Sequence, residues 1–514
     1  MNEEKNMHIK LLERTTNMSK KLFEEMELKS GVRLKNRIMM APMTIQAAYF
    51  DGTVTQEMID YYAHRSGEVG AIIVESSFVE DKGRGFAGAL GNNKDSQVKE
   101  LRKLANAIKE KGSKAILQIY HAGRMAAPEL NGGATPISAS PVSALRPEAV
   151  TPRQMMPVDI DKMIQNFADA TRRAIEAGFD GVEIHGANTY LIQQFFSPHS
   201  NRREDKWGGS REARAKFPEA VMRAVQEEVK KQQAEHFIVG YRFSPEEIEE
   251  PGIRFEDTMY LLNRLAKLKP DYFHISMGSW NRSSIINKED SQPLLEKYIE
   301  QQSEELAQIA LIGVGGVGQR SDAEATLKAG YDLVAVGKAF LVEPNWVEKA
   351  KSDEEIKDFA DISEQNLLHV PEPLWDVMDF MIRDVQAEEQ KYEQLKELQN
   401  VKITFNPGTY EASVEGHDGS GILMKVTFSD TKILAIELDG QEQPDAVATT
   451  VFKRLPEEII TGQTLQVDVI SGATVTSKSL IDGVADAVEK ANGNSEALRV
   501  RSKDAVQWES TEVR

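Results

Sequence analysis

The chain has 514 residues, enough for two or three domains, and its 40% apolar and 28% charged content is that of a globular protein. It contains no cysteine, which excludes disulfides, thiolate zinc sites and cysteine-ligated iron–sulfur clusters, so redox chemistry would need an organic cofactor. The net charge of −19 argues against nucleic acid or an anionic membrane surface as a partner, and no apolar run approaches the roughly 18 residues of a membrane span.

Short apolar runs alternate with amphipathic stretches from residue 22 onward. The expected strands are Arg37–Ala41, Gly70–Ser76, Ala115–Tyr120, Gly181–Ile184, Phe237–Phe243, Tyr272–Ser276, Ile309–Val314 and Leu333–Val336. The expected helices are Val98–Lys111, Ile160–Ala177 with Gly178 as its C-cap, Phe217–Lys231, Asp257–Leu268 and Ser321–Ala329. This alternation predicts parallel βαβ units of the α/β class. The strand count favours a closed (β/α)8 TIM barrel over a doubly wound open sheet, which periodicity does not exclude.

The composition changes along the chain and suggests five segments. Residues 1–21 form a polar arm without the apolar region of a secretory signal, so we expect a cytoplasmic protein. Residues 22–374 form the barrel, in which the Pro/Ala/Ser-rich stretch Pro128–Met156 should be a long loop over the catalytic face. Residues 375–400 are charged and predict a helical linker, residues 401–495 a small α+β domain, and residues 496–514 a mobile tail.

The small domain shows a hairpin-like pattern followed by helices. We expect strands at Val401–Phe405, Gly421–Phe428 and Ile433–Leu438, with Ser429–Lys432 as a turn between the last two. Helices are expected at Ala446–Arg454 and Ser477–Ala491.

The densest group of chemically useful side chains follows the strand that ends at Ile184. His185, Asn188 and Tyr190 stand at the strand-to-loop transition, where the catalytic groups of a TIM barrel lie. The His and Asn side chains can polarise a carbonyl and the phenol can supply a proton. In isolation, the same triplet also fits a histidine satisfied in the core and a tyrosine that packs.

Other strand ends carry polar groups in the same way. Thr44 ends the run Lys35–Thr44, Gln118 begins Gln-Ile-Tyr-His-Ala-Gly-Arg, and Arg242 is a charge within an apolar strand that needs an anion or a strong acceptor. The loop Gly313–Gly318 (Gly-Val-Gly-Gly-Val-Gly) lies between a strand and a helix, as phosphate sites in late barrel loops do. It lacks the ending of a Walker A loop, and by itself it is equally consistent with a simple turn.

Taken in order, these segments resemble the Old Yellow Enzyme family of flavin mononucleotide (FMN) oxidoreductases. Lys-Asn-Arg-Ile…Ala-Pro-Met-Thr, Gln-x-x-His-Ala-Gly-Arg, Glu-Ile-His-x-Ala-Asn-x-Tyr-Leu-Ile-x-Gln-Phe-x-Ser-Pro and Asn-x-Arg-x-Asp-x-Trp-Gly-Gly-Ser occur between about residues 22 and 371. The resemblance implies a barrel with non-covalent FMN at its C-terminal face and a reduced nicotinamide, NADH or NADPH, as the donor. The family's iron–sulfur branch is excluded because cysteine is absent.

The resemblance also implies roles for individual residues. FMN would be lined by Ala41, Pro42, Met43 and Thr44, contacted through its ring by Ser76 and Gln118, approached at its N1–C2 edge by Arg242, and held at its phosphate by Gly315, Gly316, Gly337 and Lys338. His185 and Asn188 would bind the ligand's oxygen, and Tyr190 would give the proton in alkene reduction. Lys338 departs from the family, which usually has arginine there, so its phosphate contact would be a point charge rather than a fork.

A second motif, Asp468-Val-Ile-Ser-Gly-Ala-Thr-Val-Thr-Ser477, lies in the small domain. Alone, it reads as a turn before a helix, with Thr476 or Ser477 as the N-cap. In its context the domain resembles the small flavin-binding domain of the C subunit of sodium-pumping NADH:quinone reductase. There, a flavin transferase attaches FMN through a phosphoester to the threonine of such a motif. That threonine corresponds to Thr474, with Thr476 as the fallback acceptor.

The leading hypothesis is a two-flavin electron-transfer enzyme without a metal. NADH or NADPH would reduce the barrel FMN, and the electrons would pass to FMN on Thr474 and then to a small-molecule or protein acceptor outside the chain. The alternative is an ene-reductase of α,β-unsaturated carbonyl compounds with an accessory small domain. A third interpretation is a flavin-carrying scaffold or sensor. The expected partners are therefore the nicotinamide, the acceptor and a flavin transferase, with no nucleic acid and no membrane insertion.

Overall fold

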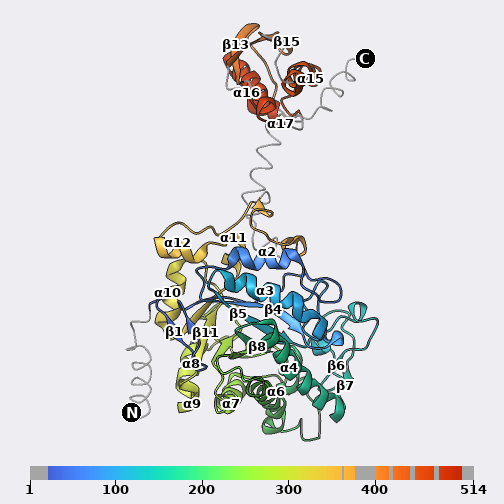
Figure 1. Cartoon of the computed structure of the whole chain (residues 1–514), viewed down its shortest axis with the longest axis vertical. Helices are drawn as coiled ribbons and strands as arrows, with labels where there is room; N and C mark the ends of the chain where they lie inside the picture. The colour runs from blue at the N-terminus through green and yellow to red at the C-terminus, as the bar shows by residue number, and fades with distance from the viewer. Residues whose placement is uncertain are drawn as a thin grey trace. The chain divides into compact units, whose positions relative to one another are not determined.

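Eight parallel strands close into a barrel with the order β10-β11-β12-β3-β4-β5-β8-β9 in this computed structural model (Figure 1). The barrel strands are β3 (Ile38–Met40), β4 (Ala71–Phe78), β5 (Lys114–Tyr120), β8 (Gly181–Gly186), β9 (Ile238–Phe243), β10 (Tyr272–Ile275), β11 (Ala310–Val314) and β12 (Leu333–Val336). The expected TIM barrel is therefore confirmed. The open doubly wound sheet is excluded because β9, the last strand of this order, pairs with β10, the first. The structure describes residues 21–361, 364–376, 398, 401–415, 421–439, 446–467 and 474–500.

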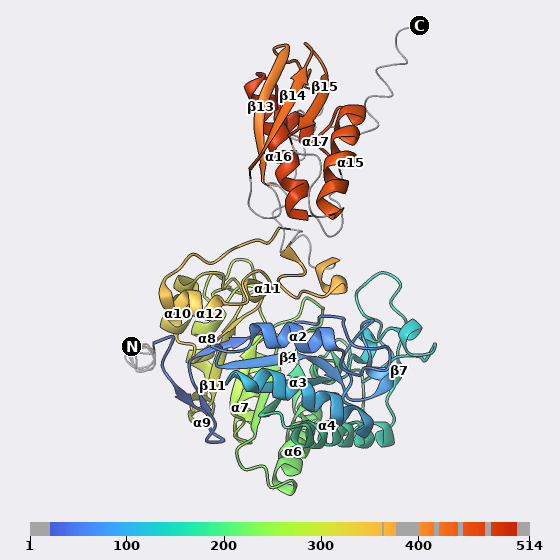
Figure 2. The same ribbon diagram turned by 45° about the horizontal axis from the view of Figure 1, so that its top comes forward.

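Helices surround the barrel in the two views of Figures 1 and 2. They are α2 (Gln56–Arg65), α3 (Val98–Glu110), α4 (Pro157–Ala177), α5 (Leu191–Phe196), α6 (Arg211–Lys231), α7 (Phe255–Ala266), α8 (Leu294–Gln301), α9 (Glu304–Ala307), α10 (Arg320–Ala329), α11 (Lys338–Val342) and α12 (Trp346–Ser352). Gly178 ends α4 with a left-handed φ of 86°, as expected of a glycine C-cap. The helix α6 begins six residues before the expected Phe217, because Ser210 caps it by accepting from the Ala213 N–H.

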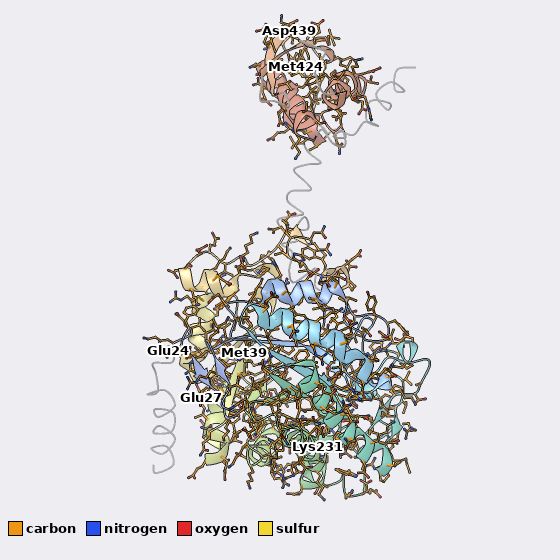
Figure 3. All side chains as sticks on the ribbon, viewed as in Figure 1. Glu24, Glu27, Met39, Lys231, Met424 and Asp439 are labelled. Carbon is orange, nitrogen blue, oxygen red and sulfur yellow. The ribbon has the colours of Figure 1, made fainter. Side chains whose placement is uncertain are left out.

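Alternate strand residues divide between two cores. Met39, Ile73 and Ile312 belong to a cluster inside the barrel, which also receives Leu28 and Leu34 at the hairpin of β1 (Met26–Glu27) and β2 (Arg33–Leu34). Their strand neighbours join the larger cluster formed with the helices. This period of two is the pattern of strands covered on both faces. Met39, labelled in Figure 3, marks the interior cluster.

The long loop after β5 contains short ordered pieces. These are the 3₁₀ turns Gly123–Met125 and Pro128–Leu130 and the two-residue strands β6 (Ile137–Ser138) and β7 (Arg153–Gln154), which pair with each other. Further 3₁₀ turns lie at Asp81–Gly83 and Asp95–Gln97. The loop begins where β5 ends, so it lies at the C-terminal face of the barrel.

The chain divides into two compact units, Met1–Asp384 and Val385–Arg514. The second unit has a three-stranded antiparallel sheet of β13 (Gly408–Glu415), β14 (Gly421–Phe428) and β15 (Ile433–Leu438), with α15 (Ala446–Gly462), α16 (Thr474–Lys490) and α17 (Ser495–Val500). Its core contains Met424, labelled in Figure 3. The expected α+β class of this unit is confirmed.

Two expectations for the small unit are wrong. Val401–Phe405 is not a strand, although Phe405 packs its ring 4.7 Å from that of Phe428, and the strand that pairs with β14 is β13 instead. The expected tail after residue 495 begins with α17, whose Ala497 and Leu498 are buried in the unit's core. Residues 1–20 of the expected N-terminal arm (1–21) and most of the expected linker helix (375–400) lie outside the described residues.

Candidate active site

The site residues that the sequence predicts in the barrel segment lie near or beyond the carboxyl ends of its strands. Ser76, Gln118, His185 and Arg242 are strand residues near the ends of β4, β5, β8 and β9. The loops that leave β3, β8, β11 and β12 contain Ala41, Pro42, Met43, Thr44, Asn188, Tyr190, Gly315, Gly316 and Gly337, and Lys338 is the first residue of α11. The barrel topology therefore gathers them at one end, where TIM barrels place their active sites.

A buried hydrogen-bonded chain crosses the barrel beneath this end. Gln118 Nε2 donates to Glu183 Oε1 at 2.6 Å, and Glu183 Oε2 lies 2.9 Å from His274 Nδ1. Burial opposes ionisation of the fully buried Glu183, but the His274 ring, Arg242 and the Gln118 amide together hold its pKa below the usual value. Burial lowers the pKa of His274, so the neutral ring donates its Nδ1–H to the carboxylate.

Arg242 brings a positive charge to the same layer. Its backbone pairs with His185 on β8 and His274 on β10. Burial lowers the pKa of Arg242, while Glu183 and Tyr190 raise it and favour its charged form. Its Nε is buried and has no hydrogen-bond partner among the described residues. An unpartnered guanidinium nitrogen in an interior site calls for an acceptor from a ligand.

His185 and Asn188 both present hydrogen-bond donors. The Ala187 N–H donates to His185 Nδ1 at 3.3 Å, which leaves the proton of the neutral ring on Nε2. Burial, with the charge of Arg242, holds the pKa of His185 well below its ordinary value, so the ring stays neutral. Asn188 Oδ1 accepts from the Ser276 hydroxyl at 2.8 Å, and its amide N–H groups keep no partner among the described residues. Each of these two side chains therefore keeps a donor available to a ligand.

The loop that carries Asn188 is held in an unusual conformation. Asn188 and Thr189 have φ angles of 56° and 62°, in the left-handed region that non-glycine residues rarely adopt. The Asn188 N–H donates to Ser244 Oγ at 2.9 Å and the Thr189 N–H to Gln193 Oε1 at 3.1 Å. These bonds compensate the strain and fix the amide at the mouth of the barrel.

Tyr190 packs its ring against His185 and Tyr120. The ring centroids lie 4.9 Å from His185 and 5.1 Å from Tyr120, both in edge-to-face arrangements. Burial raises the pKa of Tyr190 to about 12, although the positive charges of Arg242 and Arg146 act to lower it. The phenol therefore carries its proton at neutral pH and can donate it.

The loop after β3 is fixed by a buried carboxyl group. The Ile45 N–H donates to Glu75 Oε2 at 3.2 Å, and burial raises the pKa of Glu75 well above its usual value. Thr44 therefore stands on a loop that is anchored at the next residue. Its hydroxyl has no hydrogen-bond partner among the described residues, so it remains available to a ligand.

A glycine-rich cavity of about 430 Å³ opens after β11 and β12. Its walls include Gly315 and Gly316, whose φ angles are 97° and 68°, together with Gly337 and Lys338. A Cβ on Gly315 would come within 2.5 Å of the Met277 carbonyl oxygen, so only glycine fits this close approach. Ala41 and Met43 lie beside Gly337, at 3.8 and 3.7 Å from the position of its missing Cβ.

The residues of this end fit an FMN molecule. The glycine-rich cavity with Lys338 suits a phosphate, and the Arg242 Nε and the Thr44 hydroxyl are unmatched donors suited to the polar edges of a flavin ring. Within the described segments, no cluster of His, Asp and Glu could hold a metal ion. No helix among the described residues is long and apolar enough to cross a membrane.

Sequence reasoning missed several residues of the site. Glu183, His274 and Glu75 are buried and ionisable, and Glu183 and His274 join two of the expected residues, Gln118 and Arg242, in one network. The signal was present, because Glu183 and His274 interrupt apolar strands just as Arg242 does.

The second expected site lies in the small unit. Thr474 is the first residue of α16, so its backbone stands at a helix N-terminus, where a phosphate group is favoured. The preceding residues of the motif, 468–473, lie outside the described residues. Thr476 and Ser477 are buried in the first turn of the helix.

Comparison with known proteins matches both units to flavin families. Residues 21–357 match the NADH:flavin oxidoreductase / NADH oxidase family, and residues 417–489 match an FMN-binding domain. The chain is 59% identical to an NADH:acrylate oxidoreductase of Vibrio harveyi and 46% identical to an NADH:fumarate oxidoreductase of Klebsiella pneumoniae (strain 342), over 96% and 92% of its own length. These alignments cover 49% and 50% of those proteins, so the chain spans about half the length of these curated relatives.

Shorter relatives match the barrel unit. A probable NADH-dependent flavin oxidoreductase of Bacillus subtilis (strain 168) is 40% identical over 69% of this chain and 95% of its own. Among solved structures, morphinone reductase aligns with a TM-score of 0.57 at 27% identity, over 66% of this chain and 92% of its own. An old yellow enzyme homologue from Zymomonas mobilis aligns with the same score at 24% identity, over 65% and 94%, and shows the fold alone. The two expected resemblances are confirmed.

Proposed function

We propose that this chain, which belongs to the NADH:flavin oxidoreductase / NADH oxidase family, oxidises a reduced nicotinamide at the barrel and delivers the electrons to an acceptor outside the chain. One observation carries the proposal: the paired donors of His185 and Asn188 stand at the barrel end that also holds the buried, unmatched Arg242 and the glycine-rich cavity. Donors for a ligand oxygen beside residues that suit FMN support hydride transfer between a nicotinamide and a flavin.

FMN in the barrel would be held by three groups of residues. Gly315, Gly316, Gly337 and Lys338 would bind its phosphate, Ala41, Pro42, Met43 and Thr44 would line it, and Ser76, Gln118 and Arg242 would contact its ring. When bound, FMN supplies the redox chemistry, since it accepts a hydride and releases the electrons singly or as a pair.

The chain's own residues orient the reactants and set the charge. His185 Nε2–H and the Asn188 amide would bind the carboxamide oxygen of the nicotinamide, which fixes its ring in the orientation that hydride transfer needs. Arg242 places a buried positive charge where negative charge develops on reduction, and Glu183 keeps the arginine ionised.

Anaerobic rapid mixing of the FMN-loaded protein with NADH tests this proposal. The flavin absorbance should bleach in a phase that saturates with NADH, and Asn188→Ala should weaken the apparent affinity about fivefold, the value of one hydrogen bond. Asn345→Ala is the matched control, because Asn345 is exposed and its side chain has no hydrogen bond among the described residues. Bleaching no faster than that of free FMN would contradict the proposal.

A second FMN attached through a phosphoester to Thr474 would carry the electrons onward. The match to an FMN-binding domain over residues 417–489 and the place of Thr474 at the start of α16 support this. Attachment requires a flavin transferase. Protein co-expressed with that enzyme should give a fluorescent band on a denaturing gel, which Thr474→Ala abolishes. Loss of the band in Thr476→Ala alone would assign the fallback acceptor instead.

The acceptor lies beyond the chain in this proposal. The relatives named for acrylate and fumarate are about twice as long as this chain, which supports delivery of electrons toward the reduction of an unsaturated carboxylate by a further protein part. A reduced nicotinamide as the donor places the barrel in the cytoplasm. Cell fractionation against a cytoplasmic marker enzyme checks this location.

Tyr190 favours a second candidate function, reduction of an α,β-unsaturated carbonyl compound in the barrel itself. Its pKa of about 12 keeps the phenol protonated beside the donors of His185. Turnover of an enone such as cyclohexenone with NADH tests this candidate, and a rate no higher than that of free FMN would remove it.

A further inference from the structure

A second cavity opens beside the ligand-binding donors of the barrel and has no part in the function proposed above. It measures about 260 Å³ and is lined by the loops that follow β5, β8, β9 and β10. Thr189 and Ser244 belong to its wall, and Ser244 Oγ accepts from the Asn188 N–H. The cavity, which we call the loop pocket, therefore begins where the site for the nicotinamide ends.

The walls of the loop pocket contain charged side chains that already have hydrogen-bond or ion-pair partners. Arg124 and Glu249 form a buried ion pair at 3.0 Å. Glu246 accepts from the Ser284 hydroxyl at 2.7 Å and from the Ile285 N–H at 3.1 Å. Glu247 accepts from Gln193, Ser197 and the Ile253 N–H. These bonds give the pocket a fixed shape before any ligand arrives.

The rim of the loop pocket has exposed apolar side chains and one arginine, Arg146, without a partner among the described residues. Leu145, Ile248 and Ile285 expose 64%, 71% and 43% of their surface at the pocket, which is unusual for large apolar side chains that stand together. Arg146 lies among them, and its guanidinium has no hydrogen-bond or ion-pair partner in the described part of the chain. Arg146 lines this pocket together with Thr189, which directly precedes Tyr190, so Arg146 lies beside the proposed nicotinamide site.

We propose that the loop pocket binds the adenosine half of a nicotinamide dinucleotide, with its base between the apolar rim residues and its pyrophosphate against Arg146. The proposal rests on the function given above, because the nicotinamide must be held at His185 and Asn188. The volume of about 260 Å³ is below the range of about 300–1,000 Å³ for sites that hold a whole small ligand, so the pocket would take only part of the dinucleotide. An anionic pyrophosphate needs a cation to bind it, and the chain as a whole is negative, with a net charge of −19. Arg146, whose guanidinium has no partner among the described residues, would supply that cation.

The same residues determine how the site treats NADPH. Its additional 2′-phosphate would need a second cation, but Arg124, the other arginine of the pocket, is paired with Glu249 and donates to the Ser143 carbonyl. NADPH should therefore bind no more tightly than NADH.

Binding of ADP-ribose to the FMN-loaded protein, measured by titration calorimetry, tests the pocket without turnover. ADP-ribose carries the adenosine and both phosphates but no nicotinamide. Arg146→Gln should raise its dissociation constant about fivefold, as expected for one partly exposed ion pair. Arg223→Gln, a substitution of an exposed arginine on α6, is the matched control and should leave the constant unchanged. Equal binding by Arg146→Gln and the native protein, or no binding by either, would overturn the proposal.

Rapid mixing with NADH and with reduced nicotinamide mononucleotide, which lacks the adenosine half, separates the pocket from the proposed function. The native protein should be reduced at lower concentrations of NADH than of the mononucleotide, and Arg146→Gln should lower this preference about fivefold. Equal affinity of the native protein for the two donors would refute the pocket while the function stands. Absence of reduction by both would instead refute the function.

Discussion

Two fully buried glutamates in the barrel should respond in opposite ways to the same substitution. His274, Arg242 and Gln118 hold the pKa of Glu183 below its usual value and favour its ionised form, whereas burial raises the pKa of Glu75 well above its usual value and favours its protonated form. Glutamine resembles a protonated carboxyl group in shape. Glu183→Gln therefore removes a charge from the interior, and Glu75→Gln removes none.

The expected loss of stability in each variant depends on the partners that the substituted side chain leaves behind. Removing one member of a buried ion pair costs about 3–5 kcal/mol, because the other charge is left uncompensated. Glutamine at 183 can still accept from Gln118 and can bond His274 in its other tautomer, so the lower end, about 3 kcal/mol, applies. Glu75→Gln keeps the acceptor for the Ile45 N–H and should cost less than about 1 kcal/mol.

The two variants should also differ in their pH dependence. The depressed pKa of Glu183 contributes stability that is present above the ordinary carboxyl pKa of 4.5 and is lost as the pH falls. The raised pKa of Glu75 contributes stability that is present below 4.5 and is lost as the pH rises. At pH 7, Glu75→Gln should therefore lose less than about 1 kcal/mol of stability relative to the native protein, and the stability deficit of Glu183→Gln should shrink toward pH 4.

Urea unfolding of the FMN-free protein provides the assay, with near-ultraviolet circular dichroism reporting on the barrel and midpoints compared at pH 7 and pH 4. Equal losses for the two variants at pH 7 would refute the assignment of charge. So would a deficit of Glu183→Gln that grows in acid.

Three further substitutions or conditions test the site. Tyr190→Phe should reduce enone reduction by about 10²–10⁴-fold, the worth of a general acid, while NADH oxidation with an artificial acceptor stays within about twofold in steady-state assays. Lys338→Ala should weaken FMN binding about tenfold in a fluorescence titration and Lys338→Arg should preserve it, and no change in the alanine variant would exclude a phosphate contact. Because the pKa of His185 is depressed, carboxamide binding should show no step near the ordinary histidine value of 6.5, and a step that disappears in His185→Asn would contradict this.

Much of the barrel could be predicted from the sequence because its signals are local. Each parallel strand is covered on both faces and reads as a short apolar run, so the expected Leu333–Val336 coincides with β12. The site could be predicted to the same extent, since polar residues directly after such runs must gather at one end of a barrel. The network of Glu183 and His274 was not predicted, because its members are separated by 91 residues and become partners only when β8 and β10 both pair with β9.

The small unit shows what local patterns cannot decide. Ile403 and Phe405 alternate as strand residues do, but alternation reports burial and not pairing, and both pack on the core without a ladder partner. The strand β13 contains Thr409, Glu411 and Ser413 on its other face, which weakens its apolar signal. Similarly, α17 is fixed by distant contacts, since the Leu498 carbonyl accepts from both Thr464 Oγ1 and the Leu465 N–H.

Anaerobic titration with NADH of protein co-expressed with a flavin transferase tests the two-flavin relay most directly. Each flavin takes up one hydride equivalent, so the native chain should consume twice as much NADH as Thr474→Ala before excess NADH remains. Equal consumption by the two proteins, with covalent flavin present only in the native chain, would show that electrons do not pass from the barrel to the second flavin.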